Sequence, residues 1–283
     1  MAMTITEFRA RKSSGKKLAL LTSYDAPTAR ALEAAEIDAI LIGDSVGTNV
    51  LGYDSVTQVT GNDIIHHARA VARGAPDTLL IADLPFLSFQ ASDSQALHNS
   101  RRIIQRGQVQ AVKLEGGSAV ENRVRAIVAA GVPVMGHLGL TPQSVHQLGG
   151  FHAQARDYNT ARALLDDALA LEAAGAFAIV IEPVPHPLGK LVTERLSIPT
   201  IGIGAGPGCD GEIQVFHDIA GWNLDFLPRH SKRFGDSAKA TTYIAEQYIE
   251  AVQQKDFPTI GNSFRMPQDI IACLLYTSPS PRD

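Results

Sequence analysis

Eight short aliphatic runs recur along the chain, and a helix-like, alanine-rich segment separates most of them. The runs are apolar on both faces and do not alternate, which is typical of parallel strands covered by helices. Several helix-like segments end in glycine shortly before the next run, as expected at a helix C-cap. The predicted strands are residues 17–23, 38–43, 78–83, 111–115, 132–137, 177–182, 199–204 and 213–218.

This alternation of strands and helices predicts an α/β fold, and specifically a (β/α)8 TIM barrel. The 283 residues fit one such barrel, and no break in composition divides them. A doubly wound open sheet is the alternative, because it has the same alternation. Residues 4–17 predict an extra N-terminal helix that closes the lower end of the barrel, and residues 238–254 predict the last helix.

The charge balance argues against nucleic acid and membrane partners. The chain has 25 Lys and Arg against 29 Asp and Glu, a net charge of −4, so no basic excess is available to bind phosphate backbones or anionic lipids. No apolar run is long enough to span a bilayer, and no secretory leader is recognisable. We therefore expect a soluble, cytoplasmic protein. The two cysteines, Cys209 and Cys273, have no metal-ligand spacing.

The C-terminal residues are expected to differ in origin from the rest of the chain. We predict one barrel domain over residues 1–265 and a tail over residues 266–283. Within this tail, CLLYTSPSPRD (273–283) resembles the in-frame translation of a sequencing-library adaptor. We expect this stretch to be an artefact and exclude it from the fold, so Cys273 would not be a natural residue.

Acidic residues end three successive predicted strands. Asp44 follows DAILIG, Asp83 ends TLLIAD and Glu115 ends AVKLE. In a barrel all three lie at the carboxyl ends of the strands, where the chemistry of this fold takes place. Carboxylates a few ångströms apart repel one another, so we expect a cation between them, and hard oxygen ligands suit Mg²⁺. The alternative is that each acid caps the helix that follows it.

Three further side chains lie at predicted strand ends. Lys113 precedes Glu115 by two positions and shares its face of the strand, where it pairs either with an acid or with an anionic substrate. Glu182 ends FAIVIE, and a carboxylate in an apolar barrel mouth suits a general base, although an arginine partner would make it structural. His137 could orient a substrate, but a lone histidine is more often structural.

Together these motifs are similar to those of the ketopantoate hydroxymethyltransferase family. The matching stretches run in order from about residue 4 to about residue 264. They include LTSYDAPTA, ILIGDSVG, ADLPF, VKLEGG, GHLGLTPQS, IEPVP and IGIGAG. The resemblance implies a barrel of the phosphoenolpyruvate/pyruvate type, which assembles as a homodecamer in bacterial members of the family.

The resemblance also implies a role for each matching residue. Glu182 matches the catalytic proton acceptor, and the third acid of the metal site acts either directly or through water. The implied metal ligands are Asp44, Asp83 and Glu115, and the implied contacts to the keto acid are Asp44, Ser45, Asp83 and Lys113.

The implied reaction is Mg²⁺-dependent transfer of a hydroxymethyl group from 5,10-methylenetetrahydrofolate to 3-methyl-2-oxobutanoate, which yields ketopantoate for pantothenate and coenzyme A synthesis. Glu182 would remove the C3 proton, while Mg²⁺ and Lys113 stabilise the enolate. One alternative is a barrel lyase of the isocitrate lyase or phosphoenolpyruvate mutase kind, which usually carries a cysteine loop that is not recognisable here. The other is a catalytically silent barrel, which has no reason to tolerate the charge repulsion.

Overall fold

The computed structural model describes residues 2–223 and 226–276, and its centre is a closed barrel of eight parallel strands in sequence order. Each strand pairs with the next, and β8 pairs back onto β1, so the barrel prediction is confirmed and the open sheet is excluded. The strands are β1 (Leu18–Thr22), β2 (Ala39–Ile42), β3 (Leu79–Asp83), β4 (Ala111–Glu115), β5 (Val134–Gly139), β6 (Ala178–Glu182), β7 (Thr200–Gly202) and β8 (Gly211–Gln214).

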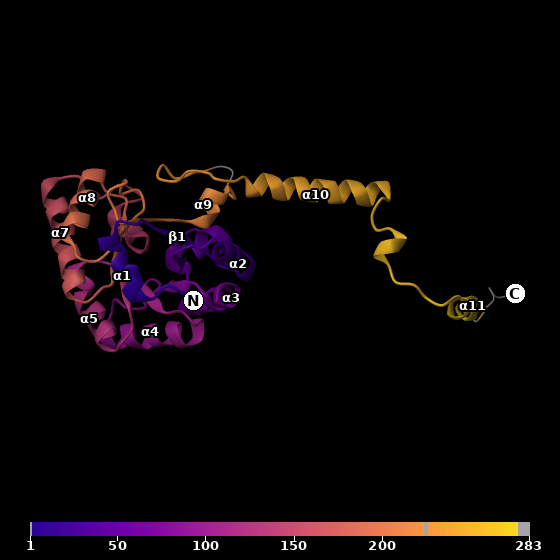
Figure 1. Cartoon of the computed structure of the whole chain (residues 1–283), viewed down its shortest axis with the longest axis horizontal. Coiled ribbons are helices and arrows are strands. Elements are labelled where there is room, and N and C mark those ends of the chain that lie inside the picture. Colours follow the sequence, from indigo (N-terminus) through magenta and orange to yellow (C-terminus); the bar gives the residue numbers. More distant parts are fainter. Residues whose placement is uncertain (1, 224–225, 277–283) are drawn as a thin grey trace. The chain divides into compact units, whose positions relative to one another are not determined.

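Helices follow the first six strands and surround the barrel, as Figure 1 shows. The α-helices are α1 (Ile5–Ser14), α2 (Ala26–Ala34), α3 (Gly61–Gly74), α4 (Asp93–Gly107), α5 (Glu121–Ala129), α6 (Val145–Leu148), α7 (Tyr158–Ala173), α8 (His186–Arg195), α9 (Phe216–Ala220), α10 (Ser237–Gln254) and α11 (Gln268–Tyr276). Short 3₁₀ or π turns are η1 (Gly47–Leu51), η2 (Val56–Gln58), η3 (Ser118–Val120), η4 (Pro142–Ser144) and η5 (Ile260–Asn262).

The last strand differs most from its prediction. It ends at Gln214, and His217 and Asp218 lie in α9, so the prediction that they end a strand is wrong. The neighbouring strand β1 ends at Thr22, and the hydroxyl of Thr22 accepts a hydrogen bond from the backbone N–H of Phe216 at 3.1 Å. Because no ladder partner remains beyond this point, the chain leaves the sheet and turns into α9.

The predicted N-terminal helix is present and closes the lower end of the barrel. A reciprocal capping box of Thr4 and Glu7 begins α1. From α1, the fully buried Phe8 packs within the barrel interior in a cluster that includes Leu18. Its ring lies edge-on to Phe177, with the ring centroids 5.5 Å apart. The amino ends of the strands are therefore sealed by apolar packing.

The chain divides into two compact units, Met1–Phe234 with the barrel and Gly235–Asp283 with α10 and α11. The predicted last helix, residues 238–254, agrees with α10. Helix α11 contains the first residues of the predicted artefact, and residues 277–283 lie outside the described part of the chain. The domain boundary at residue 265 stays a prediction.

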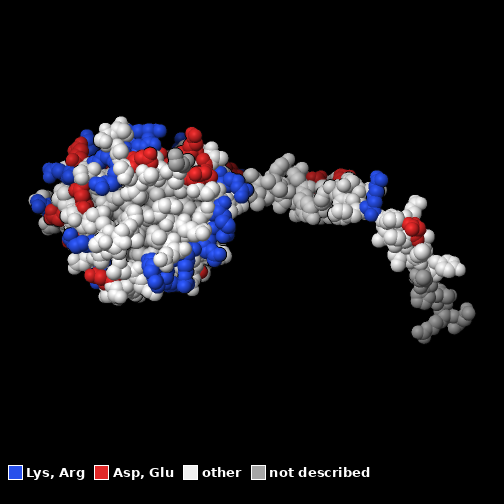
Figure 2. Space-filling model, turned by 60° about the horizontal axis from the view of Figure 1, so that its bottom comes forward, with Lys and Arg blue, Asp and Glu red and all other residues white. Residues whose placement is uncertain are grey.

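The charge of one face of the barrel unit and the hydropathy of the helices bear on possible partners. On the face of the barrel unit that Figure 2 shows, positive and negative side chains share the margin, and uncharged side chains cover the centre. No helix among the described residues combines the length and the apolar character needed to cross a bilayer. On this face the surface is therefore mixed in charge rather than uniformly basic.

Candidate active site

Three acids converge at the mouth of the barrel, from the carboxyl ends of β2, β3 and β4. We call Asp44, Asp83 and Glu115 the acid cluster. Each is almost fully buried, with exposed fractions of 5%, 2% and 5%. The strand register places Asp83 opposite Lys113 and Glu115 opposite His137, so the pairing of the strands brings charged side chains together across the sheet.

The helix-cap alternative is wrong for the acid cluster. Helices α3 and α4 are capped by Thr60 and Ser92, and no side-chain cap begins α5. By contrast Asp25, another acid near a strand end, does cap a helix, because its carboxylate accepts a hydrogen bond from the N–H of Thr28 at 2.8 Å. The cluster carboxylates point into the barrel mouth instead.

Asp83 is held by a cation on one side and by backbone on the other. Its Oδ1 lies 2.9 Å from Nζ of Lys113, and its Oδ2 accepts a hydrogen bond from the N–H of Asp44 at 2.9 Å. A Cβ atom at Gly43 would lie 3.0 Å from Oγ of Ser45 and 3.3 Å from Oδ2 of Asp83. The glycine that ends the β2 run therefore makes room for Asp83 to approach the next strand end.

Gln143, in η4, bridges the acid cluster, although no sequence pattern predicted it as a site residue. Its backbone N–H donates to Oε2 of Glu115 at 3.0 Å, and its side-chain Nε2 donates to Oδ2 of Asp44 at 2.8 Å and to the carbonyl of Leu84 at 3.0 Å. The residue lies in the GHLGLTPQS stretch, one of the motifs that carry the family resemblance, so this motif indicated that the segment belongs to the site. Nothing local in that stretch, however, indicates a partner 99 positions earlier.

Burial and mutual repulsion shift the protonation of these groups. Burial, then Asp83 and Glu115, hold the pKa of Asp44 well above its usual range. Burial also raises the pKa of Asp83, although Lys113 partly offsets the effect. For Lys113, burial acts to lower the pKa, but the surrounding carboxylates outweigh it and raise the pKa. The mouth thus holds more negative charge than Lys113 balances.

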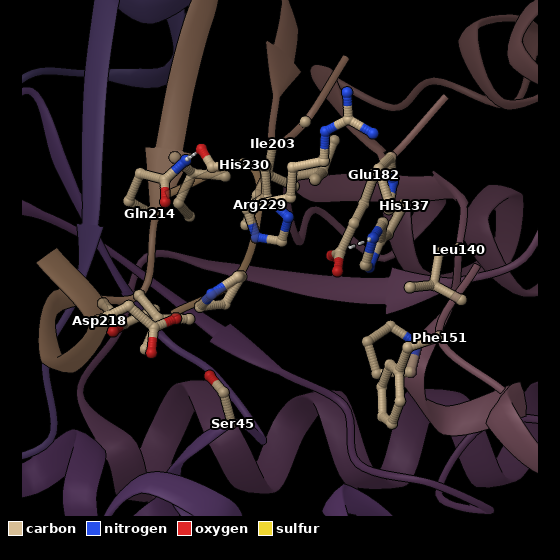
Figure 3. Close-up of a pocket in the computed structure, with 18 of the residues that line it drawn as sticks. Ser45, His137, Leu140, Phe151, Glu182, Ile203, Gln214, Asp218, Arg229 and His230 are labelled. Carbon is tan, nitrogen blue, oxygen red and sulfur yellow. Dashed lines mark hydrogen bonds and ion pairs between the residues drawn. The ribbon is translucent and has the colours of Figure 1, made fainter. Parts of the chain in front are cut away.

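Glu182 and His137 face each other on neighbouring strands, as Figure 3 shows. Nε2 of His137 lies 3.2 Å from Oε2 of Glu182, and Nδ1 lies 3.4 Å from Oε1 of Glu115. Burial and Lys113 act to lower the pKa of His137, but the hydrogen bonds to Glu115 and Glu182 raise it to about 9. We therefore treat the ring as an imidazolium that forms ion pairs with both carboxylates, and its Nδ1 also lies 3.3 Å from Nζ of Lys113.

These contacts show which partners Glu182 and His137 have. The ion-pair partner of Glu182 among the described residues is His137 and not an arginine. Glu182 keeps 16% of its side chain exposed, whereas His137 keeps 3%, so the carboxylate is the more accessible of the two to a ligand. His137, for which a structural role was the more common expectation, connects the acid cluster to Glu182.

One cavity of about 1460 Å³ joins all the predicted site residues. Beside them, Leu41 and Val180 add apolar wall from inside the barrel. The hydroxyl of buried Tyr24 lies 2.7 Å from Oγ of Ser45 and holds that side chain at the rim of the acid cluster. The predicted residues that line this cavity are Asp44, Ser45, Asp83, Lys113, Glu115 and Glu182.

The acid cluster fits a divalent cation by its charge and by its ligand type. Its oxygens are the hard ligands that Mg²⁺ prefers, and burial together with Asp83 and Glu115 raises the pKa of Asp44, an effect that a bound cation would offset. Within the described part of the chain, no three His, Cys, Asp or Glu side chains enclose an ion by themselves. Mg²⁺ is commonly held by one or two carboxylates with substrate and water oxygens, so this donor set remains suitable.

Comparisons with known sequences all match one enzyme family. The family model for ketopantoate hydroxymethyltransferase matches residues 2–260. The chain is 49% identical over 271 residues to the 3-methyl-2-oxobutanoate hydroxymethyltransferase of Dehalococcoides mccartyi (strain CBDB1), covering 96% of this chain and 97% of that protein. It is 51% identical over 268 residues to the enzyme of that name from Roseiflexus sp. (strain RS-1), covering 95% and 96%.

Solved structures with similar folds are more distant in sequence. A phosphonopyruvate hydrolase complex with oxalate and Mg²⁺ superposes with a TM-score of 0.59 at 15% identity, covering 97% of this chain and 96% of the other. A 2,3-dimethylmalate lyase of the PEP mutase/isocitrate lyase superfamily gives 0.55 at 17% identity, covering 97% and 95%. At these identities the likeness shows the fold alone, a (β/α)8 barrel, as predicted.

Proposed function

The chain belongs to the ketopantoate hydroxymethyltransferase family, and from this premise we propose that it transfers a hydroxymethyl group from 5,10-methylenetetrahydrofolate to 3-methyl-2-oxobutanoate. The product is ketopantoate, a precursor of pantothenate and coenzyme A. The observation that carries the proposal is that Glu182 and the ion pair of Asp83 and Lys113 line the same cavity, at the ends of β6 and of β3 and β4. This arrangement provides a base and charge stabilisation for one small 2-oxo acid.

The acid cluster would hold Mg²⁺, with Asp44 and Asp83 as direct ligands and Glu115 as the third acid. The ion, when bound, supplies Lewis-acid polarisation of the 2-oxo acid, which makes the C3 proton more acidic. The buried excess of negative charge around Asp44 supports this assignment. Gln143 positions two of the three acids, because it donates hydrogen bonds to Asp44 and Glu115.

Binding of the keto acid is assigned to Lys113, Ser45 and the apolar wall. The ammonium of Lys113 attracts the substrate carboxylate and the enolate oxygen, and the buried setting strengthens this attraction. Ser45 donates a hydrogen bond while Tyr24 fixes its hydroxyl. Leu41 and Val180 line the same cavity and suit the branched alkyl group of 3-methyl-2-oxobutanoate.

Proton removal is assigned to Glu182. Its carboxylate is the partly exposed group of the pair with His137, so it can reach C3 of a bound substrate. The imidazolium of His137 holds one oxygen of that carboxylate and leaves the other free to accept the proton. His137 also links Glu182 to Glu115, which ties the base to the acid cluster on β4.

The carbon transfer completes the reaction. C3 of the enolate attacks the methylene carbon of the folate, forming a carbon–carbon bond as a carbon–nitrogen bond of the folate breaks. Water then replaces the second carbon–nitrogen bond of that methylene carbon, its oxygen becoming the hydroxyl group while each released folate nitrogen takes a proton, and ketopantoate and tetrahydrofolate are released. Leu41 and Val180 line the cavity beside the acid cluster, and this apolar wall limits unproductive protonation of the enolate by solvent.

One experiment tests the two halves of the proposal separately. In D₂O the protein with Mg²⁺ should exchange the C3 proton of 3-methyl-2-oxobutanoate, as followed by NMR. The substrate should gain a carbon only when 5,10-methylenetetrahydrofolate is added. Exchange without carbon gain would contradict the folate step, and absence of both would contradict the whole proposal.

Assembly and location are proposed from family membership. We assign the protein to a homodecamer in the cytoplasm, in keeping with a biosynthetic enzyme of this family. Light scattering on the purified chain tests the assembly, since a monomeric mass at working concentration would contradict it. Fractionation of the source cells tests the location.

A further inference from the structure

The cavity is much larger than a five-carbon acid requires. Its volume of about 1460 Å³ exceeds the ~300–1,000 Å³ that is usual for pockets that bind small molecules. The acid cluster, Lys113 and Glu182 occupy the strand ends at its floor. The remaining space is lined by several segments, and two of them, one after β5 (residues 140–156) and one after β8 (residues 226–230), are called the outer walls.

Each outer wall presents an exposed aromatic side chain to the cavity. Phe151, after β5, has 70% of its surface exposed, and Phe226, after β8, has 63%. Large exposed apolar side chains in a cavity wall are expected where a flat apolar ligand binds, because the ligand removes them from water. Figure 3 shows Phe151 and Leu140 bordering the same cavity as Glu182.

Each outer wall also carries an arginine that is available to an anion. Arg156 and Arg229 line the cavity, both are exposed, and neither forms an ion pair with any residue in the described ranges. Two of the acids that line the cavity have a polar or cationic neighbour. Glu212 accepts a hydrogen bond from Gln214 at 2.8 Å, and Asp218 lies close enough to His230 to be stabilised by it.

We propose that the outer walls bind the folate co-substrate, with its aromatic rings against Phe151 and Phe226 and its glutamate carboxylates at Arg229 and Arg156. This inference rests on the proposed function. The reacting methylene group of that molecule lies between a pteridine and an aminobenzoyl glutamate, so the ligand must extend away from Glu182 as an aromatic body with an anionic end. The outer walls offer both features in the same cavity, and arginine suits bidentate binding of carboxylates.

The test compares two forms of the folate in wild type, Arg229→Gln and Arg156→Gln. One form is 5,10-methylenetetrahydrofolate monoglutamate, and the other is its diamide, in which both glutamate carboxylates are carboxamides. At least one variant should raise KM for the monoglutamate about ten-fold or more and leave KM for the diamide within two-fold of wild type. Arg101→Gln, an exposed change on α4 outside the cavity, is the matched control and should alter neither value.

The remaining outcomes overturn the inference. It fails if both cavity variants keep the monoglutamate KM of the Arg101→Gln control, or if they raise KM for both folate forms equally. It also fails if they slow C3 exchange measured without folate, because they would then act on the keto-acid site. Failure of the proposed function itself looks different, since wild type would then show neither C3 exchange nor product with either folate.

Discussion

The two ends of this barrel are built from the same strands and are equally buried, yet they differ in chemistry. In β4, Ala111 at the lower end and Lys113 and Glu115 toward the mouth are all within the buried interior. The lower end packs apolar side chains around Phe8, which gains free energy from burial. The mouth buries charges that repel one another, which costs free energy unless a ligand compensates. The comparison indicates that the lower end carries stability and the mouth carries function.

Removing the Mg²⁺ ion that we propose for the barrel mouth should have the largest effect on activity. Asp83→Ala, or EDTA added to wild type, should lower hydroxymethyl transfer about 1000-fold or more, because metal polarisation supplies several kcal/mol. The measurement is product formation at saturating substrates. Asp166→Ala, an exposed acid on α7 that pairs with Arg162, is the control and should stay active. Full activity of wild type in EDTA would refute a metal enzyme.

Glu182→Gln tests the base at the mouth. We expect C3 exchange and product formation to fall about 100- to 10,000-fold, the usual contribution of general base catalysis. Keto-acid affinity by calorimetry should change little, because the amide keeps the shape of the side chain. Glu194→Gln, on the exposed face of α8, is the matched control. Exchange at the wild-type rate in Glu182→Gln would remove Glu182 as the base.

Phe8→Ala tests the lower end. The free energy of unfolding should fall by about 3–5 kcal/mol, because the ring is fully buried against Phe177 and its loss leaves a cavity. Activity per folded molecule should remain unchanged, since Phe8 lies at the opposite end from the acid cluster. Phe8→Leu should recover most of the stability in urea unfolding. A loss of kcat with intact folding would contradict the separation of the two ends.

Lys113→Ala probes the cation that holds the keto acid. We expect KM for 3-methyl-2-oxobutanoate to rise about 10- to 100-fold, the range for a lost charge-assisted hydrogen bond. The folate KM serves as an internal control and should change much less. An unchanged keto-acid KM would return Lys113 to a structural role as the partner of Asp83.

Asp44→Asn should have the smallest effect of these changes. Unlike Phe8→Ala, it should raise the free energy of unfolding. In EDTA the variant should be about 1–2 kcal/mol more stable than wild type at neutral pH, because it removes a buried charge next to other carboxylates. The asparagine oxygen can still accept the hydrogen bond from Gln143. Urea unfolding with and without Mg²⁺ measures this, and a destabilised variant in EDTA would contradict a mouth under charge repulsion.

Much of the site could be predicted because its residues follow a local rule. Asp44, Asp83 and Glu115 each stand at the end of an apolar run, and parallel strands that close a barrel must bring such ends to one face. The family resemblance then supplied roles that spacing alone leaves open. The pairing of His137 with Glu182 could not be read in this way, because it depends on the register between β5 and β6.

The sequence by itself determined the order of strands and helices, the N-terminal helix and the acids at the strand ends, because hydrophobic period and strand termini are properties of neighbouring residues. Only the tertiary structure decided the partners. It ended β8 before His217, placed Gln143 between two carboxylates and left Arg229 open to the cavity. Such contacts join residues far apart in the chain, and their geometry is set by how the strands pair and close, which no local pattern records.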